Sequence, residues 1–61
     1  MSKYVLKRTD GKGGYVARSG SVSSYTLNIK HIRVFDTYVA AMRDRCVDNE
    51  IVVDLDEIIG G

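Results

Sequence analysis

The chain has 61 residues, a formal net charge of +1 and an apolar content of 44%. A domain of this size buries only about 60% of the surface that its unfolded chain exposes, so we expect one small domain over residues 1–61 and no enzyme. No apolar run is long enough to cross a bilayer or to form a signal peptide, and the cytoplasm is the expected compartment. Cys46 and His31 are the single residues of their kinds, which excludes an internal disulfide and a zinc site of Cys and His alone. We therefore expect no metal and no cofactor.

Charge is distributed unevenly along the chain. Residues 1–33 carry seven lysine and arginine residues against one aspartate, a net charge of +6. Residues 34–61 carry two arginines against seven acidic residues, a net charge of −5. This asymmetry indicates either a basic surface for an anionic partner or attraction between the halves, within one chain or head to tail between two chains.

The first predicted element is a β-hairpin. Two short aromatic and β-branched runs, residues 4–8 and 15–18, flank the glycine-rich segment 9–14. Glycine supplies the positive φ angles that tight loops need. We predict that Arg8 lies opposite Tyr15. A slip of one residue from this register would exchange the two faces of the hairpin. In the predicted register the core face carries Tyr4, Leu6, Tyr15 and Ala17, and the solvent face carries Val5, Lys7, Val16 and Arg18.

A polar loop, residues 19–24 with Gly20 as its hinge, is predicted to follow. The next apolar residues break strict alternation once, which indicates a strand with a bulge or two short strands. These residues are Leu27, Ile29, Ile32 and Val34. His31 is then a surface or edge residue of a strand, because a general base needs an orienting partner and a nucleophile.

Asp36 or Thr37 is predicted to cap a helix of about ten residues. Val39, Met42 and Cys46 recur at spacings of three and four, so this stripe is expected to face a sheet. Cys46 is next to Arg45, a cation that lowers a thiol pKa. Its place on the apolar stripe nevertheless favours a buried, inert thiol.

The last predicted strand covers residues 50–55, with alternate apolar side chains on one face. Residues 54–57 have capping-box spacing, which predicts a short terminal turn through residues 58–59. The element order is then β-β-(β)-α-β. We predict an α+β fold, a small antiparallel-rich sheet with one helix packed on one face.

Three motifs that resemble chemical sites have simpler interpretations. The glycine loop at residues 10–14 lacks the following helix of a phosphate-binding loop, and a hairpin turn is favoured. The acidic residues of segment 54–57 lack the spacing of an EF-hand and are expected to be solvated. The ending Gly60-Gly61 is typical of ubiquitin-like modifiers and small sulfur carriers, although the segment after the helix is short for the later strands of that fold. The carrier function is kept as a third alternative.

The basic residues suggest a binding surface. Sheets that bind single-stranded nucleic acid combine cations with exposed aromatic rings. The predicted register puts Tyr4 and Tyr15 in the core, and the overall charge is far from the basic balance of such modules. The candidate binding residues are Lys7, Arg18, Tyr25, Lys30, His31 and Arg33.

Several segments together carry a family resemblance. They are Tyr4-Val5-Leu6-Lys7, Gly14-Tyr15-Val16-Ala17, Ser24-Tyr25-Thr26, and Arg33-Val34-Phe35-Asp36-Thr37 leading to Ala41. The set resembles a class of small uncharacterised bacteriophage and prophage proteins of the short β-hairpin plus helix type. The chain departs from it at Ile32, where a small residue often precedes the basic one, and at Val39-Ala40, where acids often occur. The class has no agreed activity. The resemblance implies an accessory role in the cytoplasm of a bacterial host.

We therefore expect a non-enzymatic phage or prophage accessory protein that binds a host or phage protein, for example as an inhibitor of a host factor. The alternative is a nucleic-acid-binding module that uses the basic face of the hairpin. Opposite charges on the two halves and an unpaired sheet edge leave homodimerisation open.

Overall fold

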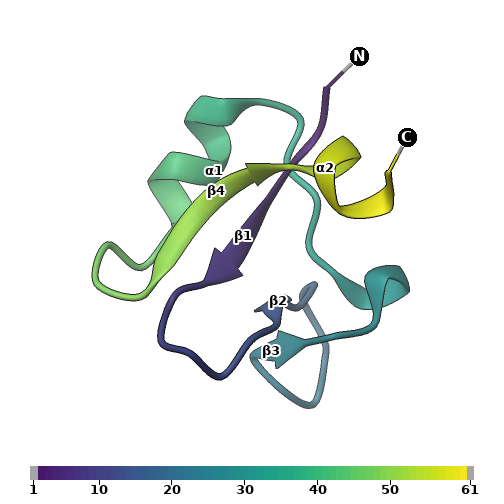
Figure 1. The fold of residues 1–61 in the computed structure, drawn as a ribbon, viewed down its shortest axis with the longest axis vertical. Coiled ribbons are helices and arrows are strands. Elements are labelled where there is room, and N and C mark those ends of the chain that lie inside the picture. The colour runs from purple at the N-terminus through teal and green to yellow at the C-terminus, as the bar shows by residue number, and fades with distance from the viewer. Residues whose placement is uncertain (1, 61) are drawn as a thin grey trace.

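The computed structural model describes residues 2–60 and shows a four-stranded antiparallel sheet (Figure 1). Strand β1 (Tyr4–Arg8) pairs with β4 (Glu50–Asp54) on one side and with β2 (Tyr15–Val16) on the other. Strand β3 (Tyr25–Thr26) pairs with β2, so the strand order is β3-β2-β1-β4. The predicted α+β class is confirmed.

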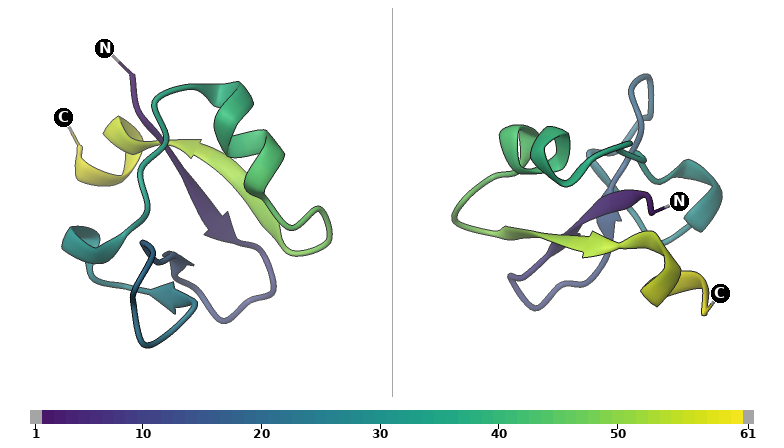
Figure 2. Two further views of the ribbon diagram at one scale, coloured as in Figure 1. Left: turned by 180° about the vertical axis from the view of Figure 1, so that it is seen from behind. Right: turned by 90° about the horizontal axis from the view of Figure 1, so that it is seen from above.

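Three helices connect or extend these strands. The 3₁₀ helix η1 (Ile29–His31) follows β3, α1 (Tyr38–Asp44) precedes β4, and α2 (Leu55–Ile59) continues from β4. In the right view of Figure 2, α1 lies on one side of β4 and α2 turns to the other side. No helix among residues 2–60 is long and apolar enough to cross a membrane.

The predicted hairpin register is wrong by one residue. Tyr15 lies opposite Lys7, not opposite Arg8. The loop closes at Gly14, which has a φ of 98° and whose carbonyl accepts a hydrogen bond of 3.0 Å from the Arg8 N–H. The positive φ would strain any residue with a Cβ, so glycine suits this position; the Cβ itself would lie 3.4 Å from the Thr26 carbonyl oxygen.

The corrected register exchanges the predicted faces of β2. Val16 now shares a face with Leu6 and Tyr15 shares a face with Lys7. The core consists of Leu6, Phe35 and Ala41, with Tyr4, Val16 and Val52 packed against them. Val5, predicted to lie on the solvent face, is fully buried. Both faces of the central strand are therefore covered over part of its length.

The strand predicted over residues 27–34 is mostly absent. Asn28 begins η1, because its side-chain oxygen accepts a hydrogen bond of 3.0 Å from the Lys30 N–H. That local bond competes with strand pairing. Ile32 is buried and makes an isolated bridge to Ala17, whereas Leu27 is exposed. His31 is exposed as predicted but belongs to η1.

Helix α1 is shorter than predicted and packs differently. Thr37 is its cap, with Oγ1 accepting a hydrogen bond of 3.1 Å from the Ala40 N–H. Only Ala41 is buried, because the small side chain lets the helix approach the core closely. Val39 and Met42 are exposed, so the predicted stripe is wrong.

Cys46 lies beyond the end of α1 and is exposed. The predicted burial of this thiol is therefore wrong. The helix ends at Asp44, and Arg45 already has an extended backbone with a ψ of 148°. That ending removes Cys46 from the helical stripe.

The C-terminal elements lie where they are predicted, except that the strand ends one residue earlier. Its predicted apolar face is only partly right, because Ile51 is exposed and Val52, from the other face, packs against the core cluster. Leu55 begins α2, and Asp54 caps this helix by accepting a hydrogen bond of 2.9 Å from the Asp56 N–H. Gly60, with a φ of 70°, ends α2 in the left-handed conformation. Gly61 of the predicted Gly-Gly motif lies outside the described residues.

Candidate binding surface

Strand β3 lies between two surface hollows. The serine-loop pocket, of about 650 Å³, is lined by Ala17, Arg18, Ser19, Gly20, Ser21, Val22, Ser23, Tyr25, Thr26 and His31. The glycine-loop pocket, of about 410 Å³, is lined by Arg8, Lys12, Gly13, Gly14, Tyr25, Thr26 and Leu27. Both linings contain cationic side chains and neither contains a carboxylate. Together they form a basic surface around one edge of the sheet.

The main chain brings Arg18 and His31 of the serine-loop pocket together. The Arg18 N–H donates a hydrogen bond of 2.9 Å to the His31 carbonyl, which joins the end of the hairpin to η1. The Ser21 N–H donates to the Arg18 carbonyl at 3.3 Å, and Gly20 supports this turn with a φ of 87°. Serine residues of the loop therefore line the same pocket as Arg18 and His31, a combination that suits an anionic group.

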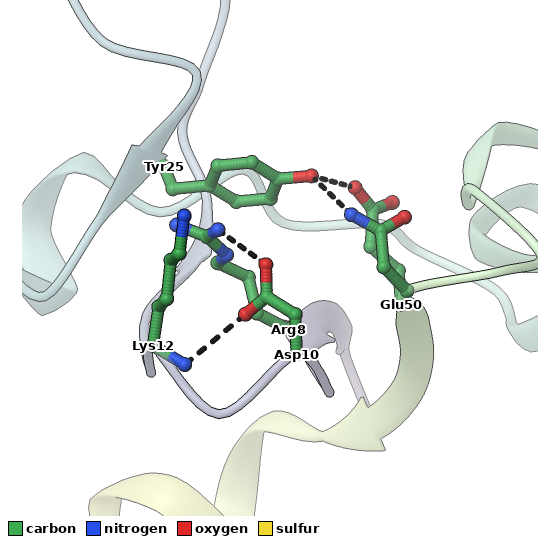
Figure 3. Close-up of polar contacts among 6 residues, drawn as sticks. Arg8, Asp10, Lys12, Tyr25 and Glu50 are labelled. Atoms are coloured by element: carbon green, nitrogen blue, oxygen red, sulfur yellow. Dashed lines mark hydrogen bonds and ion pairs between the residues drawn. The ribbon is translucent and has the colours of Figure 1, made fainter.

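The glycine-loop pocket combines Arg8 and Lys12 beside the Tyr25 ring. The Arg8 guanidinium lies 4.1 Å from the centroid of that ring, a cation–π contact. In Figure 3 the Lys12 side chain extends toward the same side of the ring. Arg8 also pairs with Asp10, and this hydrogen bond, with a second from the Lys12 N–H, lowers the pKa of Asp10.

Tyr25 is held in place by a polar cluster behind β3. Its hydroxyl donates a hydrogen bond of 2.6 Å to Oε2 of Glu50 and accepts one of 3.3 Å from Asn49 (Figure 3). Glu50 is only 6% exposed, and its Oε1 accepts a bond of 2.8 Å from the Cys46 N–H. The Glu50 hydrogen bond, followed by desolvation, raises the pKa of Tyr25. These hydrogen bonds hold the Tyr25 ring in its position, where it lines both pockets.

The six candidate binding residues predicted from the sequence do not include Arg8, Lys12 or Glu50. The sequence predicts Glu50 only as the start of a strand. Alternation along β4 puts Glu50 on the same face as Val52, and on the opposite face from Ile51 and Val53. Only the structure shows that Val52 packs against the core cluster, where a carboxylate needs a hydrogen-bonding partner.

Three of the six predicted binding residues meet at one place. Arg18, Tyr25 and His31 line the serine-loop pocket. Lys30 is exposed on η1 beside His31 but outside that lining. The structure does not bring the remaining two predicted residues, Arg33 and Lys7, to this pocket.

Arg33 and Lys7 lie elsewhere on the molecule. The Arg33 guanidinium pairs with Asp44 at 3.3 Å and lies 5.0 Å from the Phe35 ring centroid. Lys7 is exposed and lies beside Tyr15 on the sheet face opposite the core cluster. Neither residue therefore contributes to the candidate site as the structure defines it.

Within residues 2–60, no three His, Cys, Asp or Glu side chains cluster so that they could hold a metal ion. Comparisons with protein-family models, curated proteins and solved structures find no match for this chain. The features from which a function can be argued are therefore those of the structure itself: a small α+β fold with basic pockets around the β3 edge of its sheet.

Proposed function

We propose that this protein acts by binding another protein, and that the serine-loop pocket receives an acidic segment of that partner. The observation that carries the proposal is the convergence of Arg18, His31 and the fixed ring of Tyr25 on one pocket without a carboxylate in its lining. The sequence resemblance to bacteriophage and prophage proteins supports an accessory role in a bacterial host as the setting.

The residue types at this pocket suit a protein interface. Tyrosine and arginine are enriched among residues that dominate binding energy, because they combine apolar area with hydrogen-bonding groups. Val22 at the tip of the serine loop is fully exposed and adds an apolar contact beside Arg18 in the same pocket lining. An acidic group flanked by apolar residues would satisfy both features.

Affinity capture from a bacterial lysate tests this proposal with two matched charge reversals. Arg18→Glu changes the pocket, whereas Arg43→Glu changes an exposed arginine on α1 outside the pocket lining. We expect the wild type and Arg43→Glu to retain the same partner and Arg18→Glu to lose it. Retention by all three proteins, or equal loss from both variants, would refute the pocket as the contact surface.

Single-stranded nucleic acid is the second candidate partner. The observed register of the hairpin supports this partner better than the register predicted from the sequence, which put Tyr15 in the core. Tyr15 is half-buried beside the exposed Lys7, so an aromatic ring and a cation share the face opposite the core cluster. Bases stack on such rings, and phosphate contacts make the affinity fall steeply with salt. A fluorescence anisotropy titration with a single-stranded oligonucleotide at low and at moderate salt tests this candidate. Absence of binding at low salt would eliminate it.

A further inference from the structure

The outer edge of β4 is the second open edge of the sheet. In the strand order β3-β2-β1-β4, this strand pairs only with β1 among residues 2–60. Figure 1 shows β4 on the opposite side of β1 from β2 and β3. An edge strand of five residues is a template for another strand, because the N–H and C=O groups on its outer side have no ladder partner.

Two hydrogen bonds at the ends of the β1–β4 pair define which groups point outward. The Leu55 N–H donates to the Lys3 carbonyl at 2.8 Å, and the Thr9 N–H donates to the Asn49 carbonyl at 2.9 Å. Hydrogen-bonded and non-hydrogen-bonded pairs alternate along an antiparallel ladder. The odd-numbered residues of β4 therefore bond to β1, and the even-numbered residues direct their main-chain groups away from it.

Part of this outer edge is already occupied. The Glu50 N–H donates to the Cys46 carbonyl at 2.9 Å, and the Glu50 carbonyl accepts a bond from the Arg45 guanidinium. The Asp54 carbonyl is the first acceptor of α2, as is usual for a capping residue. Three groups remain: the N–H and C=O of Val52 and the N–H of Asp54.

The charge along β4 itself and in the first turn of α2 is acidic. Asp54 lies at the end of the edge, and Asp56 and Glu57 follow it in the first turn of α2. Residues 46–60 contain no lysine or arginine. Across the ladder, Lys7 lies opposite Ile51, and Lys3, which pairs with Asp36, accepts a main-chain bond from Leu55. The cation nearest in sequence, Arg45, is engaged at the other end of the strand. An extended ligand with basic side chains would therefore match both the free main-chain groups of this edge and the acidic residues beside it.

We propose that the β4 edge binds an extended basic segment of a partner protein as a fifth strand of the sheet. The segment exchanges two main-chain hydrogen bonds with Val52 and accepts a third from the Asp54 N–H. Its lysine or arginine side chains lie near Asp56 and Glu57. Main-chain bonds give such strand addition its affinity, and side-chain contacts give it specificity. This surface is separate from the basic pockets and does not depend on the function proposed for them.

The first test uses a capped peptide of alternating lysine and valine, with a capped glutamate and valine peptide as the control. Hydrogen exchange of backbone amides is followed by NMR. We expect the lysine peptide to protect the amides of Val52 and Asp54 and the glutamate peptide to leave them exchanging freely. Unchanged exchange with the lysine peptide, or equal protection by both peptides, would overturn the proposal. Protection that rises with protein concentration in the absence of peptide would overturn it as well, since the occupant would then be a second copy of this chain.

Two sets of variants separate the main-chain and charge contributions. Asp54→Pro suits the native φ of −68° and removes the outward N–H, whereas Asp54→Ala removes the same carboxylate and keeps that N–H. We expect Asp54→Pro to bind the lysine peptide about three- to tenfold more weakly than Asp54→Ala, the usual effect of one lost hydrogen bond.

The double variant Asp56→Asn with Glu57→Gln keeps every main-chain group and tests the charge contribution. It should bind the lysine peptide more weakly than the wild type, and its affinity should depend less on salt. Equal affinity of the two Asp54 variants, or an undiminished affinity of the double variant, would contradict the assigned contacts.

Discussion

Tyr25 links the candidate binding surface to the interior of the protein. Its ring lines both pockets, and its hydroxyl is bonded to the buried Glu50. A buried carboxylate that loses a hydrogen-bond donor is left with an unmet desolvation cost. Changes at this one residue should therefore affect both stability and binding.

Tyr25→Phe should lower the free energy of unfolding by about 1–3 kcal/mol, because Glu50 loses one of its hydrogen-bond donors. Urea denaturation measures the change. Tyr38→Phe is the matched control, since Tyr38 is exposed and its hydroxyl makes no hydrogen bond within residues 2–60. The control should remain within about 0.5 kcal/mol of the wild type. Equal losses in the two variants would contradict a specific role for the Tyr25 hydroxyl.

The raised pKa of Tyr25 predicts a loss of stability in alkali. The Glu50 hydrogen bond favours the protonated phenol of the folded protein, so its pKa lies above that of the unfolded chain. This contribution is fully present below about pH 10, the ordinary pKa of tyrosine, and is lost as the pH rises through the folded value. Urea midpoints measured across this range should fall more steeply for the wild type than for Tyr25→Phe. Parallel curves would show that Tyr25 and Glu50 are not coupled.

At the scale of elements, the structure shows which of two residues caps the N-terminus of α1, a choice that the sequence left open. Asp36 and Thr37 both suit a cap, but only Thr37 accepts a hydrogen bond from the helix. Asp36 instead pairs with Lys3 at 2.6 Å, with side chains 82% and 44% exposed respectively. An ion pair so exposed contributes little to stability.

Thr37→Ala should destabilise the protein by about 1 kcal/mol, the usual effect of losing a threonine cap. Asp36→Asn should change the stability by less than about 0.5 kcal/mol at neutral pH. Thermal or urea unfolding of the two variants compares these values. A larger loss for Asp36→Asn than for Thr37→Ala would reverse the assignment of the cap.

The positions of the strands along the chain could be predicted better than the register in which the strands pair. Segments 4–8 and 50–54 are recognisable because each combines β-branched residues with boundaries of glycine or acidic residues. The register could not be predicted, since three glycines with positive φ follow Asp10 and permit more than one loop closure. The predicted stripe of Val39, Met42 and Cys46 failed because α1 packs Ala41 against the core instead, and because the helix ends at Asp44, before Cys46.

At the scale of the whole molecule, the charge asymmetry of the sequence corresponds to two different sheet edges. The basic pockets surround β3, and the acidic residues of α2 follow β4 at the other edge. The convergence of Arg18, Tyr25 and His31 could be predicted as a basic, aromatic region. The contribution of Glu50 could not, because its bond to Tyr25 spans 25 residues and depends on the strand order.

An NMR titration with the capped glutamate and valine peptide tests the central claim, that the surface around β3 binds an acidic segment, most directly. The predicted result is a set of saturable shifts in the amides of residues 18–26 and His31, which weaken with salt and are lost in Arg18→Glu but not in Arg43→Glu. Shifts confined to α1 or β4, or no shifts at low salt, would contradict the account.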